Sequence, residues 1–169
     1  MPVRLPIETE RLTLRAFVPE DREAMAAIHA DPEVMRFIDT RGEDPATWVD
    51  AYVAHQARHG WGVWAIEERA TGELIGEAGL SLLDGRGPQL ELGWLLRRDR
   101  WGRGLATEAA RACLAAAFDE LGAREVVAVV DVGNDASLAV ARKSGFVETG
   151  QRRRGARRQH VLRARRARA

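Results

Sequence analysis

Apolar and polar residues alternate along several short stretches of the chain, which is the pattern of strands that bury one face. In residues 8–17, apolar side chains fall on every second position, at Leu12, Leu14 and Ala16, the period of two that a half-buried strand requires. Three further strands are predicted in succession over residues 61–68, 74–83 and 90–97. The turns between them are short and contain glycine, which favours an antiparallel meander.

A helical pattern precedes and follows this meander. Helix starts are marked after Pro19, at Asp31–Pro32 and at Asp44–Pro45, and Gly60 ends the last of these helices. After the meander, an alanine-rich helix over about residues 104–120 leads into a β-branched run at 125–132. A strand, a helix and a buried strand in this order predict a parallel βαβ unit at the centre of the sheet.

These elements predict a single α/β (α+β) domain with a mixed, mostly antiparallel sheet flanked by helices. A chain of 169 residues is long enough for one such core. We place the main domain in residues 1–150 and treat residues 151–169 as an Arg-rich C-terminal segment that can add a last hairpin to it.

The Arg-rich segment makes the charge distribution uneven. The net charge is +1, yet residues 150–169 contain nine arginines and no acidic residue, so the rest of the chain is acidic. Clustered arginines suit a phosphate backbone, which makes a ribosome or RNA contact one interpretation. Because Lys143 is the only lysine, arginine is the ordinary cation of this chain, and a solvated surface is the other interpretation.

The composition of the chain argues against membrane, secreted and metal-binding proteins. No apolar run approaches the roughly 20 residues of a membrane span, and the first residues carry Glu8 and Glu10 where a signal peptide would be apolar. We therefore expect a cytoplasmic protein without a membrane contact. The only cysteine, Cys113, is expected in the core. No metal site is expected, because His55 and His59 lack the glutamate of a zinc-protease helix.

The stretch "RRDRWGRGLATEA" at residues 97–109 carries the clearest chemical signal. Gly102 and Gly104 remove side chains where a strand turns into a helix, which leaves backbone N–H groups free beside the positive end of the helix. Four arginines, Arg97, Arg98, Arg100 and Arg103, flank them. The pattern favours a phosphate-binding loop, with an ordinary helix start beside solvated charges as the alternative. It matches neither a Walker loop nor a complete dinucleotide fingerprint.

The motif "WGRGLATEA", preceded by "LELGWLL" and followed by "NDASLAVARKSGF", resembles the Gcn5-related N-acetyltransferase (GNAT) superfamily. The similarity is to its branch of ribosomal-protein N-terminal acetyltransferases and covers about residues 8–150. It implies a GNAT-like fold in which acetyl-coenzyme A lies between two splayed central strands. A homodimer is common among similar proteins.

The resemblance assigns cofactor contacts by position. The pyrophosphate loop of the family falls on Trp101, Gly102, Arg103, Gly104, Leu105 and Ala106, followed by Thr107, with Trp101 departing from the usual Gln or Arg. A strand bulge, for which Gly93 is suited, would let the backbone of Leu95, Leu96 and Arg97 pair with the cofactor amides. Asn134 and Ser137 match an N-x-x-S motif that faces the pantetheine and the sulfur.

The chemistry of acetyl transfer requires a neutral amine and a base near it. At pH 7 an α-amine with a pKa of about 7.8 is roughly one-seventh neutral, whereas a lysine is neutral only about once in 2,500. A weak base therefore suits an N-terminal α-amine. Glu91, on the strand that would border cofactor and acceptor, is the candidate base, and Glu77 on the neighbouring strand is the second candidate.

The general acid that assists departure of the thiolate is harder to assign. Much of the superfamily uses a tyrosine seven places after the asparagine, where this chain has Ala141. The resemblance offers Ser137 instead, with helix capping as its alternative role. Trp48, Tyr52, Trp61 and Trp64 either wall an acceptor groove or fill the core. We expect direct acetyl transfer to a peptide N-terminus. The alternatives are transfer to a small amine such as an aminoglycoside or polyamine, a non-catalytic acyl-coenzyme A sensor, and an Arg-tailed nucleic-acid binder.

Overall fold

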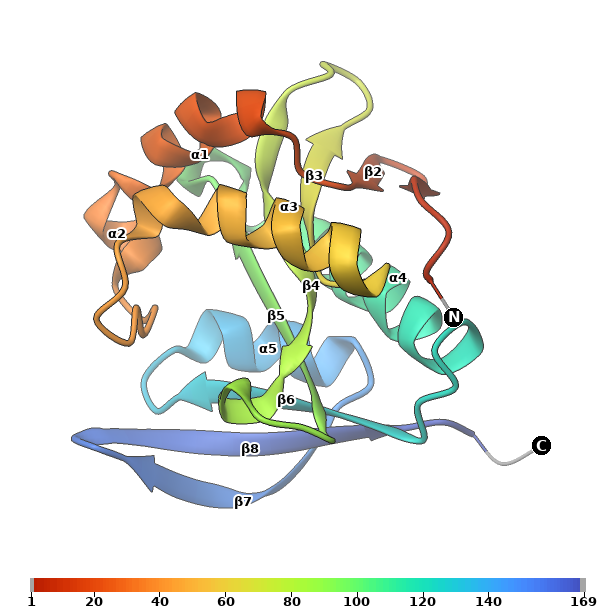
Figure 1. Cartoon of the computed structure of the whole chain (residues 1–169). Helices are drawn as coiled ribbons and strands as arrows, with labels where there is room; N and C mark the ends of the chain where they lie inside the picture. Colours follow the sequence, from red (N-terminus) through yellow and green to blue (C-terminus); the bar gives the residue numbers. More distant parts are fainter. Residues whose placement is uncertain (1, 168–169) are drawn as a thin grey trace.

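The computed structural model describes residues 2–167 and contains one eight-stranded sheet with helices packed against it (Figure 1). The sheet order is β1-β2-β3-β4-β5-β6-β8-β7. The strands are β1 (Ile7–Glu8), β2 (Leu12–Arg15), β3 (Val63–Glu68), β4 (Leu74–Leu82), β5 (Leu90–Leu96), β6 (Glu125–Asp131), β7 (Val147–Arg154) and β8 (Arg157–Arg165). The helices are α1 (Arg22–His29), α2 (Pro32–Met35), α3 (Trp48–His59), α4 (Leu105–Asp119) and α5 (Asp135–Lys143).

The predicted mixed fold is confirmed. β3, β4 and β5 form an antiparallel meander. β5 and β6, which α4 connects, are the one parallel pair among the described strands. Sequence patterning was sufficient here because a crossover helix between two sheet neighbours enforces a parallel arrangement.

Two hydrophobic clusters cover the two faces of the sheet, since side chains alternate along each strand. One cluster joins α4 to the sheet and includes Trp64, Leu92 and Cys113, so the cysteine lies in the core as predicted. The other cluster joins three helices, α1, α2 and α3, to the opposite face of the sheet and includes Phe17 and Leu95. No helix in residues 2–167 combines the length and the apolar character that a membrane crossing needs.

Short polar side chains lie at the predicted helix starts. Asp31 caps α2, whereas Asp44 caps a 3-10 turn over Pro45–Thr47, and α3 itself begins at Trp48. The carboxylates of Asp31 and Asp44 accept hydrogen bonds from backbone N–H groups two residues ahead, at 2.9 and 3.0 Å. Gly60 ends α3 in the left-handed conformation, with φ of +73°. These caps hold α3 over the sheet face that carries the site described below.

The Arg-rich segment supplies the end of β7 and all of β8 in a hairpin at one edge of the sheet, with β8 antiparallel to β6 (Figure 1). The hairpin begins at Val147, before the predicted boundary at residue 150. Most arginines of the segment pair with carboxylates of other elements: Arg152 and Arg154 with Asp84, Arg157 with Asp131, Arg163 and Arg165 with Glu125, and Arg166 with Asp119. The acidic body and the basic segment therefore neutralise each other within the sheet.

Candidate active site

A glycine-rich loop joins β5 to α4 and presents unpaired backbone N–H groups. Gly102 and Gly104 have φ of +72° and +76°, values that L side chains rarely adopt. The N–H of Glu108 donates to the carbonyl oxygen of Gly104 at 3.1 Å. Within the part of the chain that the structure describes, the N–H groups of residues 102–107 have no hydrogen-bond acceptor. Free donors at the positive end of a 15-residue helix form an arrangement that binds phosphate.

Arg11 fixes this loop from the N-terminal side of the sheet. Its guanidinium donates to the carbonyl oxygen of Arg103 and to the carboxylate of Glu108, both at 2.8 Å. The hydroxyl of Thr9 donates to the same carboxylate at 2.6 Å. Burial raises the pKa of Glu108, but these hydrogen bonds outweigh burial and lower it. The loop is therefore held in place by groups distant in sequence.

The arginines that flank the loop differ in their partners. Arg97 forms ion pairs with Glu73 and Asp99, and Arg100 with Glu68, Glu73 and Asp99. Arg103, by contrast, has no carboxylate within 4.0 Å among residues 2–167. The expectation that all four arginines add charge for a phosphate is wrong for Arg97 and Arg100, because neighbouring carboxylates neutralise them.

β5 and β6 are paired only where they begin. Leu90 pairs with Val126 and Glu91 with Val127, and neither strand pairs with the other beyond these positions. β5 continues to Leu96 and β6 to Asp131. The two central strands are therefore splayed, as the resemblance implied.

The predicted bulge at Gly93 is wrong. Gly93 lies opposite Gly79 in a β4–β5 register that runs without a shift from Leu90 to Leu96. Backbone groups of β5 are left without a partner because β6 diverges, not because β5 bulges.

The alternation along β5 decides which backbone groups face the opening. The N–H of Arg97 donates to the carbonyl oxygen of Ile75 at 2.7 Å, so Arg97 and, two residues earlier, Leu95 direct their backbone groups toward β4. Those two assignments are therefore wrong. Trp94 and Leu96 direct theirs toward the opening. The indole of Trp101 donates to the carbonyl oxygen of Leu96 at 2.9 Å, which leaves the Leu96 N–H available.

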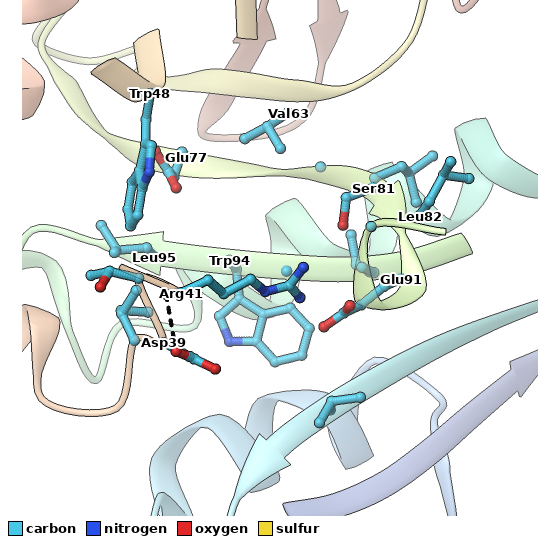
Figure 2. Close-up of a pocket in the computed structure, with 18 of the residues that line it drawn as sticks. Asp39, Arg41, Trp48, Val63, Glu77, Ser81, Leu82, Glu91, Trp94 and Leu95 are labelled. Carbon is cyan, nitrogen blue, oxygen red and sulfur yellow. Dashed lines mark hydrogen bonds between the residues drawn. The ribbon is translucent and has the colours of Figure 1, made fainter. Parts of the chain in front are cut away.

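A cavity of about 680 Å³ lies beside this opening (Figure 2). Its walls come from the segment after α2, from α3, from strands β3 to β8, and from the first turn of α5. Four of the chemically informative side chains line it, namely Glu77, Glu91, Asn134 and Ser137. Residues 101–107 do not line it, so the loop and the cavity are separate parts of one candidate site.

Glu91 lies at the end of the cavity where β5 and β6 still pair. Its Oε2 atom is buried without a hydrogen-bond partner among the described residues. Burial raises the pKa of Glu91, while the charges of Arg41 and Arg152 act in the opposite direction. Figure 2 shows the guanidinium of Arg41 reaching toward this carboxylate. A carboxylate with a raised pKa is suited to accept a proton near neutral pH.

The first turn of α5 places Asn134 and Ser137 at the cavity wall. The side-chain oxygen of Asn134 accepts from the Ser137 N–H at 3.3 Å and so caps the helix. The Ser137 hydroxyl has no hydrogen-bond partner in residues 2–167. Capping therefore falls to Asn134, and the hydroxyl is free to donate. The methyl side chain of Ala141, which is buried, offers no proton donor at that position.

The opposite end of the cavity contains groups that sequence reasoning did not connect. The hydroxyl of Tyr52 donates to Oε1 of Glu77 at 3.1 Å, and Trp48 lies beside Glu77 in Figure 2. Trp48 and Tyr52 line the cavity, whereas Trp64 is completely buried and Trp61 packs against the core. Trp48 and Tyr52 therefore take the predicted place in a cavity wall, and Trp61 and Trp64 take the predicted place in the core.

Comparisons with known proteins agree with this geometry. A family profile described as an acetyltransferase (GNAT) domain matches residues 11–147. From Bacillus subtilis, the uncharacterized N-acetyltransferase YoaA is 32% identical over 85% of this chain and 84% of its own length, and YdaF, named as a candidate ribosomal N-acetyltransferase, is 28% identical over 86% and 83%. An Aspergillus fumigatus protein named FsC-acetyl coenzyme A-N(2)-transacetylase is 32% identical over 85% of this chain and 66% of its own length.

Solved structures show the same fold. An acetyltransferase from Agrobacterium tumefaciens superimposes with a TM-score of 0.80 at 32% identity, covering 96% of this chain and 95% of that one. Mycobacterium smegmatis RimJ, solved in complex with CoA-disulfide, gives a TM-score of 0.77 at 23% identity, covering 98% and 86%. With the profile spanning most of the chain and the splayed strands and glycine loop in place, the protein belongs to the GNAT family of acetyltransferases.

Proposed function

We propose that the protein transfers an acetyl group from acetyl-coenzyme A to the α-amine of a peptide or protein N-terminus, directly and within a ternary complex. The observation that carries the proposal is the pair of free groups in one cavity, namely the buried carboxylate of Glu91 and the hydroxyl of Ser137. Acetyl-coenzyme A supplies the acetyl group as an activated thioester.

The chain fits this cosubstrate at two places. The unpaired N–H groups of residues 102–107 hold the diphosphate, with the guanidinium of Arg103 beside them. The free backbone groups of Trp94 and the N–H of Leu96 face the opening between β5 and β6, where the amides of the pantetheine arm can pair with them. Leu105, Ala106 and Thr107 contribute to the loop through their backbone.

Glu91 and Ser137 then take separate roles in the transfer. Glu91 accepts a proton from the attacking amine, directly or through a water molecule. The hydroxyl of Ser137 donates a hydrogen bond to the sulfur, which leaves as a thiolate and takes up its proton from solvent. A carboxylate is a weak base, so it favours an amine that is easy to deprotonate. Deprotonation at pH 7 costs about 1 kcal/mol for an α-amine and about 4.6 kcal/mol for a lysine. The name of YdaF points in the same direction.

An acceptor screen tests the proposal. Purified protein is supplied with acetyl-coenzyme A and one of four acceptors: a lysine-free peptide with a free N-terminus, the same peptide with a blocked N-terminus and one lysine, an aminoglycoside, or a polyamine. Thiol release and product mass report transfer. Faster turnover of the blocked peptide than of the free N-terminus would refute the α-amine assignment. Absence of transfer to every acceptor, on protein that binds acetyl-coenzyme A by calorimetry, would favour a non-catalytic sensor.

A small amine is the second candidate acceptor. The match to the FsC transacetylase, whose name specifies transfer to an N(2) atom, favours it. The aminoglycoside and polyamine arms of the same screen decide between the two. A nucleic-acid contact through the Arg-rich segment has less support, because six of its arginines bind carboxylates of the sheet.

A further inference from the structure

The cavity has a second acidic end, which we call the Glu77 end and define by Glu43, Trp48, Tyr52 and Glu77. All four residues line the cavity. Glu77 is only 8% exposed. Its Oε1 atom accepts from Tyr52, and its Oε2 atom has no hydrogen-bond partner among the described residues. The indole N–H of Trp48 donates to Glu43 at 3.1 Å, which adds a second carboxylate.

Glu77 has a histidine beside it but no permanently charged partner. Within residues 2–167, no arginine or lysine lies within 4.0 Å of its carboxylate, and the nearest basic atom is Nε2 of His29, at 3.8 Å. That nitrogen is itself buried without a partner. A buried carboxylate without a permanent counterion is unfavourable, and a ligand that brings a positive charge recovers part of this cost on binding.

The opposite end has the reverse electrostatic character. The carboxylate of Glu91 faces the charges of Arg41, Arg152 and Arg154, and these three arginines line the cavity. Asp84 pairs with Arg152 and Arg154, whereas Arg41 has no carboxylate within 4.0 Å of its guanidinium among the described residues. The positive charge of Arg41 opposes an ammonium group at this end and favours the neutral amine that acetyl transfer needs. A cationic group is therefore less opposed at the Glu77 end.

The aromatic residues at the Glu77 end suit the same ligand. Trp48 and Tyr52 line the cavity wall, and aromatic rings attract ammonium and guanidinium groups. Burial and the charge of Glu77 raise the pKa of Tyr52, so its hydroxyl stays protonated and continues to orient the Glu77 carboxylate.

The two ends lie a definable distance apart. Glu77 is opposite Leu95 in the register, four residues along β5 from Glu91, which corresponds to about 13 Å at 3.3 Å per residue. Between them, Gly79 pairs with Gly93, so this pair of positions places no side chain between the two carboxylates. An extended acceptor can therefore reach both carboxylates at once.

We propose that the Glu77 end is a recognition subsite for a second positively charged group of the acceptor, an ammonium or guanidinium about 13 Å from the amine that is acetylated. This inference rests on the proposed function. For a peptide acceptor, the charged group is a lysine or arginine side chain near the N-terminus. For a small acceptor, it is the distal amine of a linear polyamine.

The test compares charged and neutral acceptors on matched variants. Peptides carry lysine at the second, third or fourth position, or norleucine at the same place, and a linear polyamine forms a separate arm. The variants are Glu77→Gln, Tyr52→Phe and the control Glu148→Gln, which neutralises a carboxylate of β7 that does not line the cavity. Circular dichroism verifies that each variant is folded. The measured quantity is the ratio of kcat/KM for the lysine peptide to that for the norleucine peptide.

We expect this ratio to be about tenfold or more for the parent, or about 1.4 kcal/mol, and to fall to about one in Glu77→Gln. Tyr52→Phe lowers the ratio in part, and Glu148→Gln preserves it. A polyamine preference that Glu77→Gln abolishes supports the subsite and assigns it to a small acceptor. The inference is overturned if the parent shows no preference for a charged acceptor in either arm. It is also overturned if Glu77→Gln lowers kcat/KM for the lysine and norleucine peptides by the same factor.

Failure of the proposed function is distinguishable from failure of the subsite. If the parent acetylates no acceptor, the transfer proposal fails, and calorimetry of peptide binding decides the subsite. Tighter binding of the lysine peptide that disappears in Glu77→Gln supports the subsite, and equal binding of the two peptides overturns it.

Discussion

Replacing Glu91 by glutamine affects activity and stability in opposite directions. The substitution preserves the size of the side chain but removes its charge and its ability to accept a proton. Positioned general bases contribute about 10²- to 10⁴-fold to rate. We therefore expect Glu91→Gln to lower kcat/KM by about 100-fold or more.

The stability effect follows from the raised pKa of Glu91. The folded state binds this proton more tightly than the unfolded state, so Glu91 lowers stability as pH rises from the ordinary glutamate pKa, about 4.3, through the raised folded value. Above that window the full penalty applies. Glu91→Gln removes it, and each kcal/mol of relief raises Tm by about 2–4 °C in a chain of this size. Below about pH 4 the parent and the variant should have the same Tm, because Glu91 is then protonated in both states of the parent.

The assay combines a pH profile of kcat/KM for a lysine-free peptide with thermal unfolding of the same preparations. The parent profile should rise with pH as Glu91 and then the amine lose their protons, and the limb due to Glu91 should be absent in the variant. If the Glu91→Gln variant retains more than a third of the parent kcat/KM, another group is the base. A lower Tm at pH 7 would show that the carboxylate stabilises the fold, which contradicts its unpaired burial.

Three further substitutions test the rest of the site. Ser137→Ala should lower kcat about 100-fold without changing calorimetric affinity for acetyl-coenzyme A, and unchanged kcat would exclude Ser137 as the donor to the leaving sulfur. Gly93→Val should raise the acceptor KM about tenfold or more while Tm stays constant, because a Cβ at Gly93 meets no atom within 4 Å and about 1.4 kcal/mol of lost binding is a factor of ten. Gly79→Ala is the contrast, since its Cβ would lie 2.3 Å from a backbone oxygen, and it should unfold at lower temperature. Gly104→Ala should cost about 1–2 kcal/mol of stability and weaken acetyl-coenzyme A binding, whereas unchanged affinity would show that the loop does not hold the diphosphate.

Local patterns were sufficient to predict the fold. Alternation at Leu12 and Leu14, the caps at Asp31 and Asp44, and the glycine that ends α3 each act over a few residues. The glycine loop was equally readable, since positive φ at Gly102 is a requirement of the turn itself.

Contacts between distant residues could not be predicted in this way. The hydrogen bond between Tyr52 and Glu77 joins α3 to β4, and only the packing of the helix on the sheet brings the two together. The backbone assignments of Leu95 and Arg97 were wrong for a similar reason. Which residues of β5 face the opening depends on its register with β4, and a shift of one residue exchanges the two sides.

The arginine-rich hairpin provides the link between the end of the chain and the cavity. Asp84, on the turn after β4, binds Arg152 and Arg154 at 2.8 Å. Both arginines line the cavity and reduce the effect of burial on Glu91. Without them, burial would raise the pKa of Glu91 further and leave less of the ionised base at neutral pH. Because β8 is also the sheet partner of β6, the hairpin supports the divergent strand and sets the charge at one end of the cavity, while the Glu77 end lies beyond its arginines. The difference between the two ends of the cavity therefore originates in Arg41 and in the arginines of β7.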